Sequence, residues 1–93
     1  MRVRTTGYCN CRSCAGKWAG CMTASGKRPR AKHTIAVDKR LIPLGTKVKI
    51  GKIVYTAEDT GGAIKGKRID VYYSNHRQAS AHGVKYRKIK VYI

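Results

Sequence analysis

The fold is decided by the stretch Thr46-Lys-Val-Lys-Ile-Gly-Lys-Ile-Val-Tyr-Thr-Ala-Glu58. In its first half, Val48 and Ile50 alternate with two lysines, which is the period of two that half-buried strands show. A short link containing Gly51 follows, and glycine readily takes the positive φ that a tight hairpin turn needs. The second half is rich in Val, Ile, Tyr and Thr, the residues favoured in strands. The stretch therefore predicts two antiparallel strands joined by a tight turn.

The same strand signals recur along the chain, where Gly and Pro separate the runs. One helix is predicted between a cap at Ser74 or Asn75 and a stop at Gly83, with Ala79 on the side that faces the strands. Six short strands, one helix and many glycines indicate a small, mainly β protein with a closed barrel. The predicted strands are residues 3–8, 33–37, 46–50, 53–58, 68–73 and 88–93.

The chain has 93 residues, enough for a single compact domain spanning residues 1–93. A core of this size is marginal, so barrel closure or covalent cross-links would help to stabilise it. An irregular cysteine-rich loop is expected at about residues 7–30, where all four cysteines lie. Disulfides, a zinc site and reduced thiols all fit their spacing, which leaves the redox compartment open. The cysteines are Cys9, Cys11, Cys14 and Cys21.

The charge is strongly unbalanced, with 21 Lys and Arg against 4 Asp and Glu and a net charge of +17. Such a charge attracts polyanions and speeds their encounter with the protein. Composition alone favours nucleic acid, and the Lys, Arg and Tyr interleaved over residues 85–92 fit that partner. The bacterial cell wall is a second polyanion, through teichoic acids and the carboxylates of its peptide stems. A third interpretation is a solvated surface that serves solubility alone.

The sequence contains no run of apolar residues long enough to span a bilayer, so we expect no membrane span. The N-terminus also lacks the apolar stretch of a signal peptide. Either an export signal has been removed, or the protein reaches its substrate by another route, such as release of a phage product at lysis.

The four acidic residues are few enough that each position is informative. Asp38 and Asp59 lie at or just after the ends of predicted strands, and Asp70 lies between Ile69 and Val71. A carboxylate inside an apolar strand is costly unless it is paired or hydrogen-bonded. The aspartates can be salt-bridge anchors for the many cations. Alternatively they form a carboxylate cluster, because glycoside cleavage needs a proton donor and negative charge near an oxocarbenium-like transition state.

Three segments contain these aspartates: Thr34-Ile-Ala-Val-Asp38, Ala57-Glu-Asp-Thr-Gly-Gly-Ala-Ile-Lys-Gly66 and Arg68-Ile-Asp-Val-Tyr72. Together they resemble the 3D domain, a family named for its three aspartates. That domain occurs in resuscitation- and sporulation-related cell-wall proteins and in the membrane-bound lytic transglycosylase A family. The resemblance implies a six-stranded double-psi β-barrel. It also implies lytic transglycosylase activity on the MurNAc–GlcNAc bond of peptidoglycan, which gives a 1,6-anhydro-MurNAc end.

The resemblance assigns Asp70 as the general acid and base, with Asp59 and Asp38 beside it to stabilise positive charge or to position it. The sugar's own 6-hydroxyl attacks C1, so no activated water is required. We expect no cofactor and no metal. Hydroxyl groups, backbone N–H groups, an amine and an aromatic ring can contact the glycan, although each also has a structural interpretation as turn, cap or loop anchor. The expected substrate-binding residues are Thr23, Ser25, Thr60, Gly61, Gly62, Lys65 and Trp18.

The expected partners are peptidoglycan glycan strands and anionic wall polymers, and we expect a monomer located in the cell wall or outside the cell. Nucleic acid is disfavoured, because a polyanion binder gains nothing from clustered aspartates. Two alternatives stay open: a basic nucleic-acid-binding module, and a non-catalytic wall-binding protein of the expansin-like kind. Fold alone does not separate the second alternative from an enzyme.

Overall fold

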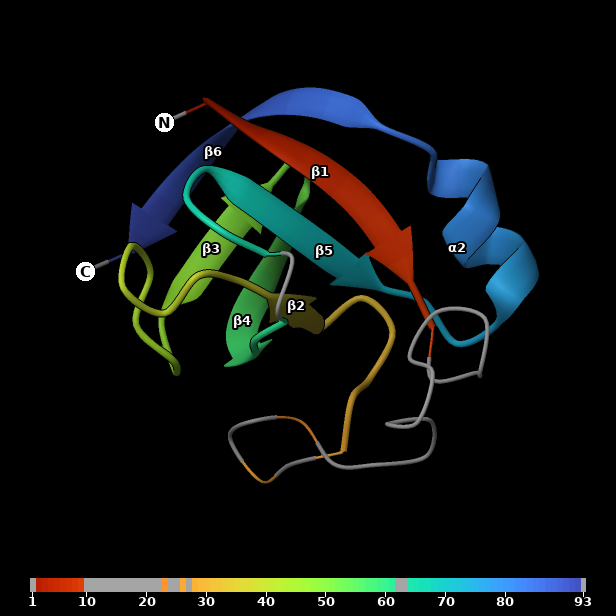
Figure 1. The fold of residues 1–93 in the computed structure, drawn as a ribbon, viewed down its shortest axis with the longest axis horizontal. Coiled ribbons are helices and arrows are strands. Elements are labelled where there is room, and N and C mark those ends of the chain that lie inside the picture. Colours follow the sequence, from red (N-terminus) through yellow and green to blue (C-terminus); the bar gives the residue numbers. More distant parts are fainter. Residues whose placement is uncertain (1, 10–22, 24–25, 27, 62–63, 93) are drawn as a thin grey trace.

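Six strands of the computed structural model close into a barrel in the order β1-β5-β2-β4-β3-β6 (Figure 1). The structure describes residues 2–9, 23, 26, 28–61 and 64–92. A short helix, α2, lies beside the barrel against β1 (Figure 1). The elements are β1 (Arg2–Tyr8), β2 (Thr34–Ala36), β3 (Lys47–Ile50), β4 (Ile53–Asp59), β5 (Arg68–Tyr72), α2 (His76–His82) and β6 (Lys85–Tyr92).

The barrel combines parallel and antiparallel strand pairs. β1 runs parallel to β5, and β2 runs parallel to β4, whereas the other neighbouring strands are antiparallel. Parallel partners cannot be joined by a tight turn, so a long connection links the two strands of each parallel pair. The predicted fold is confirmed: a mainly β, six-stranded double-psi barrel with one short helix among the described residues.

Alternate residues of the strands fill the interior of the barrel. Val48 and Ile50 are buried while the lysines between them are exposed, as the alternation predicted. The turn between β3 and β4 contains Gly51 with a φ of 62°, so the predicted hairpin is confirmed. Ile35 and Ile69 are almost fully buried, and each such side chain contributes about 1.5–3 kcal/mol to stability.

Helix α2 begins and ends where the predicted caps lie. Asn75 Oδ1 accepts a hydrogen bond from the backbone N–H of Gln78 at 2.9 Å, and Gly83 has a φ of 63° just past the last turn. Ala79 is buried, as predicted. The helix approaches β1 so closely that a Cβ on Gly7 would lie 2.6 Å from the carbonyl oxygen of Ala79. Glycine at position 7 is therefore what lets the helix dock on β1.

Strand β6 begins at Lys85, three residues before the predicted start at residue 88. Lys85, Tyr86 and Arg87 pair with residues of β1, and this pairing extends the strand. The sequence does not predict this extension, because residues 85–88 show no alternation of apolar and polar side chains. The other five strands agree with the prediction to within one residue at each end.

The N-terminal segment is described only in part. Cys9 follows β1 and is buried. The other three cysteines lie outside the described residues, so the three interpretations of the cysteine cluster stay as predicted. Over the described ranges, no helix has both the length and the apolar character needed to cross a membrane.

Candidate functional site

A one-residue shift in strand pairing at the end of β4 brings Asp59 opposite Ala36. The register of β2 and β4 shifts just before Ala36, which then pairs with Asp59. Glu58, which the shift passes over, is buried and accepts a hydrogen bond from the hydroxyl of Thr34 at 2.7 Å. Its Oε1 also lies 3.4 Å from Nε2 of His33. Glu58 is therefore engaged in a buried network, whereas Asp59 is half-buried at the edge of the barrel.

Asp59 and Asp70 lie on the same outer face of the barrel. Ala36 pairs with Asp59 on one side and with Asp70 on the other, and directly paired residues project to the same face of a sheet. That face is the outer one, because Ile69 and Val71 on either side of Asp70 are buried in the core. The two aspartates flank the small side chain of Ala36, with their Cα atoms about 10 Å apart across two strand spacings.

Tyr8 contacts Asp59 at the edge of this face. Its hydroxyl donates a hydrogen bond to Oδ2 of Asp59 at 3.4 Å. Its ring packs edge-on against the ring of Tyr72, with centroids 5.3 Å apart. Burial, followed by the negative charges of Asp59 and Asp70, raises the pKa of Tyr8 well above its usual range. The hydroxyl therefore stays protonated at neutral pH and acts as a hydrogen-bond donor between the carboxylates.

The side chain of Asp70 is half-buried on the outer face of the barrel, beside other polar groups. Its Oδ1 is buried and has no hydrogen-bond partner among the described residues, and the same is true of Oγ1 of Thr6, its register partner on β1. Burial raises the pKa of Asp70, and the nearby positive charges of Arg68 and Arg4 oppose that shift only in part. A raised pKa favours the protonated form of the carboxyl group, which is the form that a general acid needs.

Asp38 has a different environment, because its carboxylate is occupied by hydrogen bonds. Oδ2 accepts from the backbone N–H of Gly66 at 2.9 Å, and Oδ1 accepts from the backbone N–H and from Nε of Arg40 at 3.1 and 3.3 Å. These bonds, the one from Gly66 above all, lower the pKa of Asp38 to about 2. Asp38 is therefore ionised at neutral pH and ties its own loop to the turn before β5.

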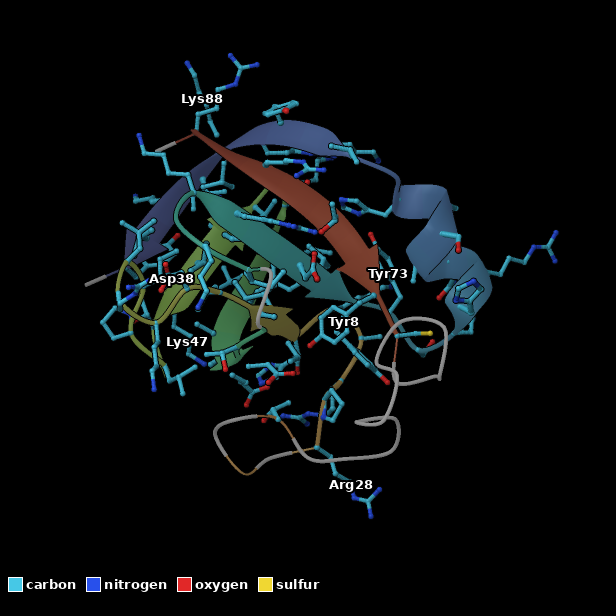
Figure 2. The ribbon with its side chains drawn as sticks, in the orientation of Figure 1. Tyr8, Arg28, Asp38, Lys47, Tyr73 and Lys88 are labelled. Carbon is cyan, nitrogen blue, oxygen red and sulfur yellow. The ribbon has the colours of Figure 1, made fainter. Side chains whose placement is uncertain are left out.

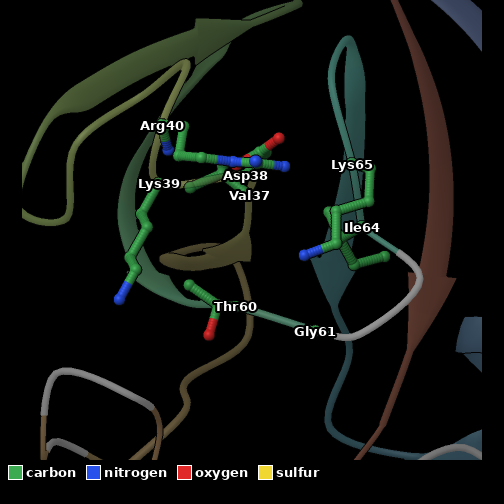
Figure 3. Close-up of a pocket in the computed structure, with 8 residues that line it drawn as sticks. All are labelled: Val37, Asp38, Lys39, Arg40, Thr60, Gly61, Ile64 and Lys65. Atoms are coloured by element: carbon green, nitrogen blue, oxygen red, sulfur yellow. The ribbon is translucent and has the colours of Figure 1, made fainter.

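A hollow of about 290 Å³ lies between these two loops (Figure 3). Asp38 lies at its side, and the cations of Lys39, Arg40 and Lys65 surround it. Figure 3 shows Arg40 extending across Asp38 toward the space between the loops, with Lys65 facing it from the other loop. Its lining residues are Val37, Asp38, Lys39, Arg40, Thr60, Gly61, Ile64 and Lys65. One lining residue, Thr60, directly follows Asp59 in the chain.

The structure brings together some of the predicted site residues. Asp59 and Asp70 share an outer face, while Asp38 lines the neighbouring hollow together with Thr60, Gly61 and Lys65. Thr23 is buried, with 5% of its surface exposed. Within the described ranges, no three His, Cys, Asp or Glu side chains gather as metal ligands do. Three predicted residues lie outside the described part of the chain: Trp18, Ser25 and Gly62.

Three residues of this region were not found by sequence reasoning. Thr6 pairs with Asp70 across two parallel strands, a relationship that only the barrel topology creates. The bond of Tyr8 to Asp59 joins residues 51 positions apart, which spacing along the sequence does not show. The contact of Arg40 with Asp38 could have been predicted. An Asp side chain often accepts a hydrogen bond from the backbone N–H two residues later, which forms an Asx-turn.

Comparison with known proteins finds a family match and two relatives whose names refer to the cell wall. The sequence matches the 3D domain over residues 33–93. It is 51% identical to the cell wall-binding protein YocH of Bacillus subtilis over 75% of this chain and 26% of that protein. It is 42% identical to YabE, a protein of the same organism named for cell wall shaping, over 98% of this chain and 22% of that protein. The chain thus spans about a quarter of the length of these relatives.

Solved structures of lytic transglycosylases have the same fold. The enzyme LtgG of Burkholderia pseudomallei superposes with a TM-score of 0.67 and 26% identity, over 74% of this chain and 25% of that chain. MltA of Escherichia coli, in a structure with bound chitohexaose, has a TM-score of 0.64 and 24% identity over 74% of this chain and 26% of that chain. The fold, the three aspartate segments and the sequence match agree, and the chain belongs to the 3D domain family.

Proposed function

We propose that this domain cleaves the MurNAc–GlcNAc bond of peptidoglycan as a lytic transglycosylase, with Asp70 as general acid and base. The observation that carries the proposal is the state of Asp70: an outward-facing carboxyl group with a raised pKa and a buried oxygen that meets no hydrogen-bond partner in the described residues. Such a group is suited to giving a proton to a ligand. The similarity to LtgG, a lytic transglycosylase, supports the proposal.

The reaction needs one group that first gives a proton and then takes one. Protonated Asp70 donates its proton to the glycosidic oxygen, and the bond between that oxygen and C1 of MurNAc breaks. Asp70, now a carboxylate, takes the proton of the sugar's 6-hydroxyl while the O6 atom forms a bond to C1. Proton transfer of this kind contributes about 100- to 10,000-fold to a rate.

Asp59 supplies negative charge while positive charge develops at C1. It lies across Ala36 from Asp70, on the same face. Tyr8 donates to Asp59 and keeps its carboxylate oriented toward that face. A fixed charge in a partly dry site stabilises an oxocarbenium-like transition state more strongly than the same charge does in water.

Asp38 acts as a positioning residue in this proposal. It holds the backbone of Gly66, two residues before β5 begins at Arg68, and so fixes the entry into the strand that carries Asp70. The adjoining hollow receives the neighbouring part of the glycan, with its Thr60 hydroxyl, the backbone of Gly61 and the Lys65 amine as contacts. We also keep as proposed glycan contacts Trp18, Thr23, Ser25 and Gly62.

A second function, wall binding without cleavage, is favoured by one observation. The curated relatives YocH and YabE are named for wall binding and wall shaping, and neither name refers to an enzyme. Under this alternative the outer face of Asp70 holds glycan without breaking it.

The experiment that separates the two is incubation of the protein with purified peptidoglycan, followed by mass spectrometry of the soluble products. The enzyme proposal expects released muropeptides with 1,6-anhydro-MurNAc ends. The binding alternative expects protein that sediments with the wall and releases no fragment. Released fragments with ordinary reducing ends would contradict the transglycosylase proposal in favour of a hydrolase.

A further inference from the structure

One face of the barrel combines four cations and two tyrosines. Along β6 the side chains of Tyr86, Lys88, Lys90 and Tyr92 project outward, because the alternate residue Ile89 is buried in the core. The neighbouring strands add Arg2 from β1 and Lys49 from β3. We call the set Arg2, Lys49, Tyr86, Lys88, Lys90 and Tyr92 the β6 face. Both of its tyrosines are exposed, Tyr86 by 63%.

Like charges lie directly opposite one another on the β6 face. Arg2 pairs with Lys88 across β1 and β6, and Lys49 pairs with Lys90 across β3 and β6. Two like charges in such a position destabilise a sheet. The strands β1, β3 and β6 contain no Asp or Glu that could relieve the repulsion. A surface that served solubility alone would mix both signs, so this arrangement indicates an anionic ligand.

The β6 face lies on the far side of the barrel from the aspartate site. In the closed strand order, β6 is three strands away from β2 in either direction. The acidic residues lie on β4, on β5 and two residues after the end of β2. Figure 2 shows Lys88 projecting from the barrel well apart from Tyr8. A long polymer can therefore occupy the β6 face while the aspartate site stays open.

The tyrosines of the β6 face are partly covered by its cations. The guanidinium carbon of Arg2 lies 5.9 Å from the ring centroid of Tyr86, and Nζ of Lys90 lies 5.4 Å from the ring centroid of Tyr92. Nucleic acid bases are bound in part by stacking on open aromatic faces. Because a cation already lies over each ring, we expect the four cations of this face, more than its rings, to make the contacts with a ligand. Lys88 and Lys90, two residues apart on one strand, present such charges about 6.8 Å apart.

We propose that the β6 face binds a linear phosphodiester polymer of the cell wall, of the teichoic acid class, and so holds the domain on its substrate. The choice of a wall polymer rests on the proposed function at the wall. The choice of this face rests on its opposed like charges and its place opposite the aspartates. Phosphate contacts by lysines release counterions, so binding weakens steeply as salt rises.

The test compares two triple variants that lose the same charge. Lys49→Gln/Lys88→Gln/Lys90→Gln removes three lysines of the β6 face, and Lys52→Gln/Lys67→Gln/Arg77→Gln removes three exposed cations elsewhere. Binding to purified teichoic acid is measured over a range of salt concentrations. The first variant is expected to lose at least about tenfold in affinity, with a salt slope reduced by about one per lysine in contact, whereas the control stays within about threefold of the wild type.

Equal losses in both variants would show that only net charge matters and would overturn the proposal. Tighter binding of a single-stranded oligonucleotide than of teichoic acid, lost through the same three lysines, would overturn it in favour of nucleic acid. The first variant is expected to keep the wild-type rate on soluble glycan fragments free of teichoic acid. The two measurements distinguish the two proposals. Absence of cleavage by the wild type counts against the proposed function, whereas unchanged teichoic acid binding by the first variant counts against the β6 face.

Discussion

The hydroxyl group of Tyr8 donates a hydrogen bond to Oδ2 of Asp59 at 3.4 Å. Tyr8 is the last residue of β1 and Asp59 is the last residue of β4, so the contact joins the ends of two strands that are not neighbours in the barrel. The negative charges of Asp59 and Asp70 both raise the pKa of Tyr8. The outer face of the barrel is thus organised around three side chains, and two of them are acidic.

Tyr8→Phe is expected to lower glycan cleavage by about tenfold, because a hydrogen bond to a charged group is worth about 1.5 kcal/mol or more. The ring contact with Tyr72 needs no hydroxyl, so the fold should persist. Cleavage rate and thermal melting would be measured together. An unchanged rate would show that Asp59 needs no orienting donor.

Asp70→Asn is expected to be more stable than the wild type at pH 7 and equally stable near pH 3. Burial raises the pKa of Asp70, so the folded state binds its proton more tightly than the unfolded chain does. Its stabilising effect is complete below the unfolded pKa of about 3.9 and is lost as pH rises through the folded pKa. Thermal melts of both proteins at the two pH values check this. A variant that is less stable at pH 7 would mean that Asp70 gains more from Arg68 and Arg4 than burial costs it.

Asp38→Asn is expected to behave in the opposite way. The folded pKa of Asp38 is lowered to about 2, so its contribution to stability is present above about pH 4 and is lost as pH falls toward 2. The variant should melt at a lower temperature than the wild type at pH 7, and the difference should shrink at pH 2. A difference of the same size at pH 7 and pH 2 would contradict this explanation, because it would show that the stability lost in the variant does not depend on the ionised charge of Asp38.

Gly7→Ala is expected to destabilise the protein by about 1–3 kcal/mol, since the added methyl group would meet backbone atoms of α2. A Cβ there would lie 2.6 Å from the carbonyl oxygen of Ala79 and 2.9 Å from Cβ of His82. A change of 1 kcal/mol shifts the melting temperature of a domain of this size by about 4–8 °C. Gly26→Ala removes a glycine with no atom near its Cβ position, although its φ of 83° adds some backbone strain. A smaller shift for Gly26→Ala than for Gly7→Ala would support a role for close docking, and equal shifts would contradict it.

Much of the fold could be predicted because local signals and tertiary structure agree. Val48 and Ile50 alternate with lysines and are buried. Asn75 caps the start of helix α2 and Gly83 caps its end, as the sequence predicted. The early start of β6 could not be predicted, because its added residues are polar and pair only through their alignment with β1. Periodicity reports burial and carries little information on pairing between distant strands.

The candidate site could be predicted in its residues but not in its geometry. The aspartate segments identified Asp59 and Asp70, yet nothing in the sequence indicated that Asp59, and not the adjacent Glu58, pairs with Ala36. That pairing depends on the register shift beside Ala36. Likewise, the bond from Gly66 to Asp38 joins loops 28 residues apart, which sequence spacing does not show.

The central claim, proton transfer by Asp70 without attack by water, is tested most directly by digesting purified peptidoglycan in water enriched in oxygen-18. The wild type and Asp70→Asn would be compared by mass spectrometry of the released glycan ends. We expect wild-type products with 1,6-anhydro ends that carry no oxygen-18, and a rate for Asp70→Asn lower by about 100-fold or more. Oxygen-18 in the new sugar ends, or anhydro products from Asp70→Asn at more than about a tenth of the wild-type rate, would contradict it.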